Sequence, residues 1–307
     1  YTPPVGAVKS PEAPTETPTQ ARAAPFPATS TGRRTAFARW LTDRQNPLFA
    51  RVVVNQVWAR HFGRPLVATV FDFGRKGARP THPELLDWLA VEFIDGGYSL
   101  KKLHRLVVTS AAYRMGSSTA GADAAAKADP ENRTLWRQNP VRLEAQAVRD
   151  ALLRLSGTLD PTLGGPSVPL AAAETSTRRS LYFVHSHNDH HKFLTQFDDA
   201  NVLECYRRTE SIVPQQALAL ANSRFALTAA EAIAKRLPAG DDGAFVTAAF
   251  GLVLGCSPTA DEKAACLDAL REWRTLLAGQ KGTDAAAKAR ANLVGALVNH
   301  NDFVMVR

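Results

Sequence analysis

Hydrophobic residues recur at intervals of three and four positions through most of the chain after residue 33. This spacing places side chains on one face of an α-helix. In the stretch 81–97, for example, Leu85, Leu89 and Phe93 fall on one such face before a glycine pair ends the run. The same pattern predicts further helices at about 33–43, 47–63, 100–114, 139–157, 214–237, 259–278 and 284–299.

Local signals place several of the helix ends. Thr81 and Glu84 have the spacing of a capping box, in which each side chain bonds the backbone amide of the other residue. Ser99 is expected to cap the helix that follows it, and Gly63 suits the left-handed conformation that closes a helix. Pro214 is expected in the first turn of a long helix.

Two segments depart from the helical pattern. The sequence RRSLYFV contains the short apolar run Leu181–Val184, which predicts a buried strand, and residues 116–133 are small, polar and alanine-rich. The predicted fold class is therefore mainly α, with at most one short strand pairing. We expect a single multi-helix domain over residues 33–307, with a possible subdivision near 116–133.

Residues 1–32 have a different composition, with seven prolines, many threonines and alanines, and few large apolar side chains. Such a segment buries too little surface to offset the loss of chain entropy, so it is predicted to be a disordered linker. The chain begins at Tyr1 and not at a methionine, which indicates a piece of a longer polypeptide. No apolar run approaches the roughly 20 residues that cross a bilayer.

The net charge of +8 is concentrated near the start of the predicted domain, where residues 33–64 hold seven arginines and one acidic residue, Asp43. One interpretation is a surface that attracts an anionic polymer or polysaccharide. The pattern favours a solvated or internally paired helix face, because the arginines alternate with an apolar stripe. Nucleic acid is disfavoured as a partner, since no aromatic platform or recognised nucleic-acid motif accompanies the arginines.

The three cysteines exclude two kinds of site from this segment. None of them stands in a C-x-x-C or C-x-x-C-H arrangement. The chain therefore encodes neither a zinc knuckle nor a covalent haem attachment.

The sequence HSHNDHHKF at 185–193 concentrates half of the eight histidines of the chain. Imidazole and carboxylate groups are the ligands of zinc and iron, so these residues are candidate ligands of a divalent metal. A pH-sensitive patch or a polar loop after the predicted strand explains the same residues, because no defined ligand spacing such as H-E-x-x-H is present. The candidate ligands are His185, His187, His190, His191 and Asp189.

A second group of charged residues follows at 197–210, in the sequence FDDANVLECYRRTE. Charges beside apolar residues predict partly buried ion pairs, and a structural salt-bridge cluster is the favoured interpretation. The alternative is a cleft with perturbed carboxylates, which would be a candidate active site. The residues are Asp198, Asp199, Glu204, Arg207, Arg208 and Glu210.

The triplet DFG at 72–74 has the letters of the magnesium-binding motif of protein kinases. The kinase interpretation fails because no glycine-rich phosphate loop or strand lysine precedes it. Asp72 is expected instead to order a turn, with Arg75 or Arg79 as a further partner. No catalytic motif is recognisable elsewhere, so the sequence leaves open whether the chain is an enzyme.

Several long motifs occur in order along the chain: NPLFARVVVNQVWARHFGRPLV, DFGRKGARPTHPELLDWLAVEF, SLKKLHRLVVTSAAYR, DPENRTLWRQNPVRLEAQAVRDALL, LGGPSV and ESIVPQQALALANSRF. Together they resemble the planctomycete cytochrome-associated C-terminal domain, a family of unknown function. The resemblance runs from about Arg33 to the closing ALVNHNDFVMV. It implies the last domain of a large exported protein with a cytochrome c domain upstream, so haem would belong to the parent protein and not to this segment. It supplies no catalytic residues.

Two function classes follow from these observations. The leading hypothesis is an extracytoplasmic module that acts in binding, assembly or as a redox accessory, with the upstream domains of its own polypeptide as partners. The rival is a metal-dependent enzyme, hydrolase-like, that uses the His, Asp and Glu residues of 185–210.

Overall fold

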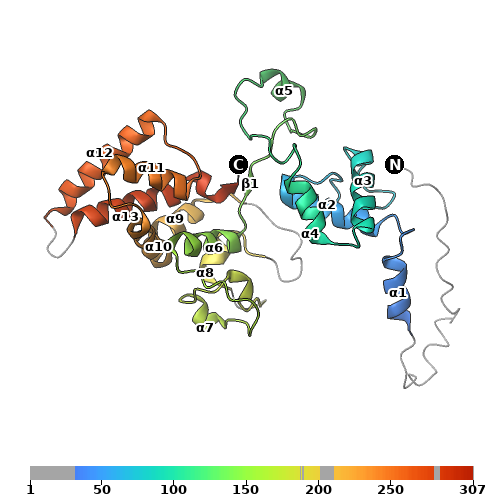
Figure 1. The fold of residues 1–307 in the computed structure, drawn as a ribbon. Coiled ribbons are helices and arrows are strands. Elements are labelled where there is room, and N and C mark those ends of the chain that lie inside the picture. Colours follow the sequence, from blue (N-terminus) through green and yellow to red (C-terminus); the bar gives the residue numbers. More distant parts are fainter. Residues whose placement is uncertain (1–31, 187, 189, 201–210, 280–283, 307) are drawn as a thin grey trace. The chain divides into compact units, whose positions relative to one another are not determined.

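The computed structural model describes residues 32–186, 188, 190–200, 211–279 and 284–306. These residues form thirteen α-helices, two short 3-10 helices and one two-stranded sheet (Figure 1). The predicted fold class, mainly α with at most one short strand pairing, is confirmed. Residues 1–31, most of the predicted linker, lie outside the described part. No helix among the described residues combines the length and the apolar character that crossing a bilayer requires.

The chain divides into two compact units, with the boundary after Val141. The first unit runs to Val141 and the second covers Arg142–Val306. The predicted domain, 33–307, spans both units, and the subdivision predicted near 116–133 lies shortly before the boundary. Each unit has its own cluster of buried hydrophobic residues.

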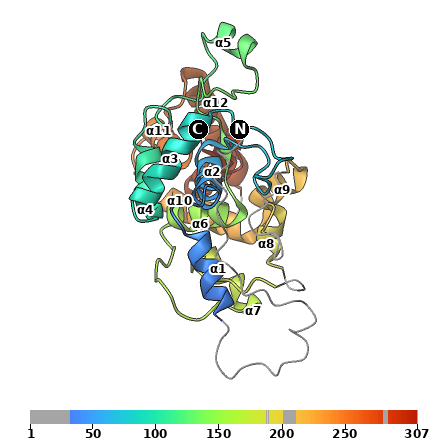
Figure 2. The ribbon, with the colours of Figure 1, turned by 90° about the vertical axis from the view of Figure 1, so that its right-hand side faces the viewer.

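The first unit is built on three helices that pack together. Helices α3 and α4 lie beside α2 in both ribbon views (Figure 1; Figure 2). Trp58 and Phe62 of α2 stack with ring centroids 4.1 Å apart and form the centre of this core with Leu89 and Phe93 of α3. The helices of this unit are α1 (Arg33–Leu41), α2 (Phe49–Phe62), α3 (Pro83–Asp95), α4 (Leu100–Val108) and the short α5 (Asp123–Ala128).

Two of the predicted helix ends in this unit are confirmed and one is wrong. Gly63 closes α2 in the left-handed conformation, and the Ser99 hydroxyl accepts a hydrogen bond from the amide of Lys102. The capping box of Thr81 and Glu84 does not form, because α3 begins at Pro83 with His82 as its N-cap. Thr81 instead donates its backbone amide to the carbonyl of Leu66 (2.9 Å).

The loop between α2 and α3 is held by a buried side chain of α2. Asn55 is fully buried, and its amide group bonds both backbone groups of Val67, accepting from N (2.8 Å) and donating to O (3.0 Å). Farther along, Asp72 accepts from the amide of Gly74 (2.8 Å), so Asp72 orders a turn as predicted. No ion pair joins Asp72 to Arg75 or Arg79 within the described residues.

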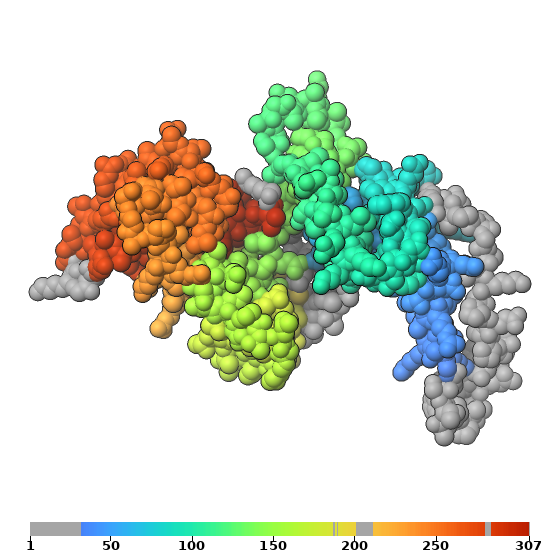
Figure 3. All heavy atoms as spheres, in the orientation of Figure 1, coloured from blue at the N-terminus to red at the C-terminus, as the bar shows by residue number. Residues whose placement is uncertain are grey.

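The second unit is a larger helical body around a continuous apolar core. Helix α13 packs against both α10 and α12, and the residues of α11–α13, in orange to red, form one mass in Figure 3. Val294, Val298, Ile233 and Phe245 are fully buried at this centre. The helices are α6 (Ala145–Ser156), α7 (Leu170–Ala173), α8 (Lys192–Gln196), α9 (Pro214–Asn222), α10 (Arg224–Arg236), α11 (Asp242–Val253), α12 (Ala260–Leu277) and α13 (Ala285–Val298), with the 3-10 helices η1 (Ser180–Tyr182) and η2 (Asn301–Val304).

The long helix predicted from Pro214 is in fact two helices. Pro214 is the first residue of α9, as predicted, but the chain becomes extended at Ser223. The Ser223 hydroxyl then accepts a hydrogen bond from the amide of Ala226 and caps α10. Serine favours this role because its side chain competes with the helical backbone for hydrogen bonds.

The predicted strand at Leu181–Val184 is wrong. Residues Ser180–Tyr182 form the 3-10 helix η1, and only one isolated bridge, between Val168 and Phe183, involves the segment. The one described sheet pairs β1 (Val141–Arg142) with β2 (Met305–Val306). The prediction of burial holds for Phe183, which is 8 % exposed, but not for Leu181 (54 %) or Val184 (40 %). The backbone of η1 bonds to Asp150 of α6 through Ser180 and to Val168 through Tyr182.

Replacing Asn55 with Leu tests how the first unit holds its α2–α3 loop. The variant leaves the N–H and C=O of Val67 without their buried partners, so the free energy of unfolding is expected to fall by about 2–4 kcal/mol. Chemical denaturation provides the measurement. The control is Gln56→Leu, the next position on α2, whose side chain makes no hydrogen bond within the described residues. Equal stability of the two variants would contradict the assigned role of Asn55.

Candidate functional site

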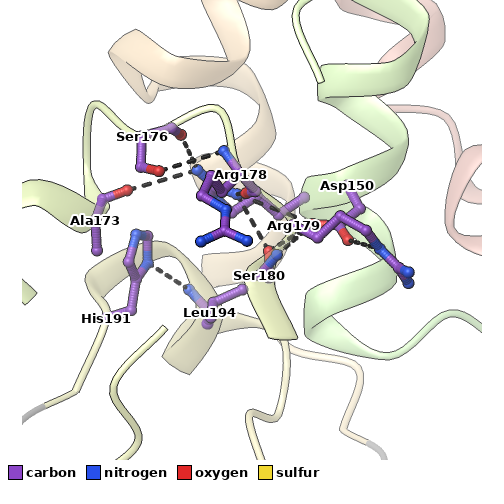
Figure 4. A network of polar contacts seen from close by, with 9 residues as sticks. Asp150, Ala173, Ser176, Arg178, Arg179, Ser180, His191 and Leu194 are labelled. Carbon is purple, nitrogen blue, oxygen red and sulfur yellow. Dashed lines mark hydrogen bonds and ion pairs between the residues drawn. The ribbon is translucent and has the colours of Figure 1, made fainter. Parts of the chain in front are cut away.

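The largest fully buried side chain among the described residues is that of Arg149, on α6, at 1 % exposure. Its guanidinium donates to the carbonyl of Arg178 (3.0 Å), the hydroxyl of Ser180 (3.2 Å) and the carbonyls of Ala173 (3.5 Å) and Ser176. Figure 4 shows these oxygens drawn in from α7, η1 and the loop between them. A buried cation is tolerated only when its N–H groups are bonded in this way.

Aromatic faces complete the environment of Arg149. The guanidinium carbon lies 4.5 Å from the ring centroid of Phe183 and 5.4 Å from that of Phe225, close enough for a cation–π attraction. Burial lowers the pKa of Arg149 to about 10, and the carboxylates of Asp150 and Glu174 act in the opposite direction. Arg149 is therefore charged at neutral pH, with its donors committed to the loop.

Asp150, the neighbour of Arg149 on α6, holds the same loop from a second point. Its Oδ1 accepts from the amide (2.8 Å) and the hydroxyl (2.7 Å) of Ser180, and its Oδ2 accepts from Arg179 (3.4 Å). The two side chains thus fix residues 173–183 against α6 through backbone groups (Figure 4). We name Arg149, Asp150 and Ser180 the arginine clamp.

His191 is buried beside the clamp, at 5 % exposure, as the N-cap of α8. Its ring stacks on Phe183 with centroids 5.2 Å apart, and Nδ1 accepts from the amide of Leu194 (3.4 Å). Nε2 has no hydrogen-bond partner among the described residues and lies 4.0 Å from Oε1 of Glu174. Burial lowers the pKa of His191, an effect that Glu174 partly offsets and Arg149 reinforces.

His185 and Asp199, which flank helix α8 in the sequence, lie next to each other. Nε2 of His185 donates to the carbonyl of Ala200 (2.6 Å), and its Nδ1 lies 3.8 Å from Oδ2 of Asp199. The other oxygen of Asp199 accepts from Gln146 of α6 (2.5 Å) and from the amide of Ala200 (2.7 Å). The side chain of Asp199 is 8 % exposed, so this carboxylate belongs to the interior.

Asp198 has a separate set of partners. Its oxygens accept from the amide (2.8 Å) and hydroxyl (2.7 Å) of Ser211 and from the amide group of Gln216 (3.4 Å). Gln216, 4 % exposed on α9, accepts in turn from Arg142. The network connects the segment before α9 to the start of the second unit, and Asp198 adopts a positive φ of 57° to take part in it.

The structure brings together only some of the residues singled out by the sequence. His185 and Asp199 are neighbours, His191 lies against the arginine clamp, and His190 is exposed. His187, Asp189, Glu204, Arg207, Arg208 and Glu210 lie outside the described residues. Within the described ranges no three His, Cys, Asp or Glu side chains are grouped as metal ligands. The metal site stays a prediction, because two of its five candidate ligands, His187 and Asp189, are not described.

Sequence reasoning missed the arginine clamp and one histidine pair. Arg149 lies on the same face of α6 as the buried residues Val148 and Leu152. A charged residue on an apolar helix face was the signal that the sequence offered. His61 and His104, 43 positions apart, approach to 2.7 Å between Nε2 and Nδ1 beside the ring of Tyr113. Burial, with a contribution from His104, lowers the pKa of His61. No sequence spacing indicates a pair formed between two helices.

The arginine-rich segment is at least partly paired. Arg44 pairs with Asp95, Arg51 with Asp87 (2.6 Å) and Arg64 with Glu131 (3.4 Å). These three pairs are what the internally paired interpretation predicts. They leave less of the segment's charge for an anionic polymer.

Comparison with known proteins places the chain in a family. The family model PSD1, described as a protein of unknown function (DUF1553), matches residues 33–270. The chain belongs to this family. The match covers the arginine clamp, His191 and both aspartates of the candidate site, so these lie within the PSD1 region. No curated protein and no solved structure matches the chain.

Replacing Arg149 with Met tests the clamp of this PSD1 chain. The apolar side chain fills similar space but leaves buried carbonyl oxygens unpaired, so the free energy of unfolding is expected to fall by about 3 kcal/mol or more. Arg154→Met, on an exposed position of α6, is the matched control and should change it by no more than about 0.5 kcal/mol. Urea denaturation measures both. A loss of equal size in the control would contradict the clamp.

Replacing His191 with Asn tests the buried imidazole, because Asn retains a capping oxygen and does not titrate. Since folding lowers the pKa of His191 from 6.5, the unfolded chain takes up the proton first as pH falls, and stability is lost below pH 6.5. This loss amounts to at most about 1.4 kcal/mol per pH unit. Denaturation at pH 7.5 and 5.5 should show a smaller pH dependence in His191→Asn than in the wild type or in the exposed control His190→Asn. An unchanged dependence contradicts the assignment.

Proposed function

We propose that this chain is a binding or assembly module, without haem of its own, in a larger exported protein that carries a c-type cytochrome domain upstream. The domains of that same polypeptide would be its first partners, with a redox-accessory role as the specific form of assembly. The resemblance of residues 33–307 to the cytochrome-associated family supports the haem context and the extracytoplasmic location.

One observation supports a binding module over a catalyst. The described carboxylates of the candidate site accept hydrogen bonds from internal donors. Asp150 accepts from Ser180, Asp198 from Ser211 and Gln216, and Asp199 from Gln146 and Ala200. A general base or a metal ligand needs a lone pair directed at the substrate or the ion. These carboxylates point their lone pairs at the segment they hold, which is the arrangement of a structural network.

The proposed cytochrome domain upstream of this chain is tested on the gene. The reading frame upstream of the codon for Tyr1 is expected to encode a C-x-x-C-H motif, the sequence that attaches haem covalently. Sequencing of the full transcript provides the observation. An upstream frame without the motif would overturn the proposed cytochrome partner.

The absence of catalysis is tested on the protein. The purified 307-residue chain is expected to have no haem absorbance and no turnover of generic esterase, glycosidase or phosphatase substrates. Elemental analysis of this chain and of a His187→Ala, His191→Ala double variant is the control for the rival function. A stoichiometric transition metal that the double variant loses, together with turnover that disappears with it, would replace the binding module by a metal-dependent enzyme.

A further inference from the structure

The first unit contains a cavity of about 610 Å³ between the start of α2, the loop 73–80 and the start of α3. This volume lies in the range of pockets that bind organic molecules. Its apolar lining includes Pro47, Leu48, Phe73 and Leu86, and Leu86 also belongs to the core of the unit. The cavity is therefore continuous with the packed interior and not a gap at the edge of a loose loop.

The wall of the cavity is fixed by short-range hydrogen bonds. The hydroxyl of Thr69 donates to the carbonyl of Asp72 (2.7 Å) and accepts from the amide of Ala78 (2.9 Å), closing the loop on itself. A Cβ on Gly77 would stand 2.2 Å from the carbonyl oxygen of Asp72, so the loop closes this tightly only with glycine there. A pocket whose wall is already ordered loses little chain entropy when a ligand binds.

The charges on the lining are unequal. Arg51 and Asp87 face each other as an ion pair (2.6 Å) at one side of the cavity. Arg75 and Arg79 also line it, and neither has a hydrogen bond or ion pair within the described residues. No second carboxylate lines the cavity to balance them. Two guanidinium groups beside an apolar cavity are suited to a planar anionic group, which a guanidinium binds through two parallel hydrogen bonds.

From this juxtaposition we propose that the first unit binds an organic carboxylate with an apolar body, its carboxylate held by Arg75 and Arg79 and its body seated on Phe73 and Leu86. The apolar lining selects against small inorganic anions, which gain nothing from it. The arginine pair selects against neutral molecules of the same shape. This site is separate from the arginine clamp, and it does not depend on whether the parent protein carries haem.

Binding is tested on the full chain with phenylbutyrate as the probe and its uncharged amide, phenylbutyramide, as the matched comparison. Backbone amide shifts in an NMR titration should move at residues 66–87 with phenylbutyrate, and the amide should bind at least tenfold more weakly. Equal affinity for phenylbutyrate and phenylbutyramide would overturn the proposal that Arg75 and Arg79 bind the carboxylate. Displacement of phenylbutyrate by inorganic sulfate at the same concentration would show a simple anion site and also overturn the proposal.

Variants separate the site from general charge effects. Arg75→Gln and Arg79→Gln are each expected to weaken phenylbutyrate binding about tenfold. Arg105→Gln, an exposed position on α4 with the same change in charge, should leave the affinity unchanged. An equal loss in Arg105→Gln contradicts the site.

A second variant tests the cavity without touching its charges. Ala78 lines the cavity and is exposed, so Ala78→Trp should fill the space and abolish binding while thermal unfolding stays close to that of the wild type. Sedimentation measures the mass of the chain in parallel. A wild-type dimer that Ala78→Trp separates, with no shift change on adding phenylbutyrate, would mean that a second copy occupies this surface and would overturn the proposal.

Discussion

The burial of one cation governs the architecture of the second unit. Arg149 stands on the apolar face of α6, where a guanidinium loses its water and must find oxygens. In a regular strand or helix the backbone carbonyls already accept hydrogen bonds from backbone amides and would not be available to Arg149. The segment 173–183, which is irregular between α7 and η1, directs three carbonyls and a hydroxyl toward Arg149. The clamp therefore explains how this segment is held against α6 and why it is not a strand.

The same interaction marks where sequence reasoning succeeds and where it ends. Helical periodicity located α2, α3, α6, α12 and α13 because that signal is repeated many times along each helix. The apolar run Leu181–Val184 predicted a buried strand, but only Phe183 of the run is buried, since hydrophobicity alone does not fix the backbone partners of a segment. The backbones of Tyr182 and Val184 bond to Val168, and Arg149 and Asp150 of α6 bond the backbones of Arg178 and Ser180 just before the run. The capping box predicted at Thr81 is absent for a related reason. The backbone amide of Thr81, which Glu84 would have bonded, donates to the distant carbonyl of Leu66.

The candidate site shows the limit of composition as a guide to chemistry. The histidine-rich segment is conspicuous in the sequence, yet His185 and His191 have different surroundings, one bonded to Ala200 and the other buried on Phe183. Their partners come from residues that no histidine spacing predicts. The ion pairs predicted for this segment stay a prediction, because Arg207 and Arg208 lie outside the described residues; the described partners of Asp198 and Asp199 include amides and a hydroxyl.

The two units use arginine in opposite ways, and this contrast separates structure from recognition. The burial of Arg149 is compensated by hydrogen bonds to four internal acceptors. If Arg149 moved to bind a ligand, those acceptors would be left unpaired in the core. Arg75 and Arg79 cost the fold little, because water solvates them, and their donors remain available beside a cavity whose wall is already ordered. A polar side chain can serve a ligand at low cost only when the fold does not already depend on its hydrogen bonds. By that criterion the loop between α2 and α3, whose arginines keep their donors available, is prepared to bind a small molecule as we propose.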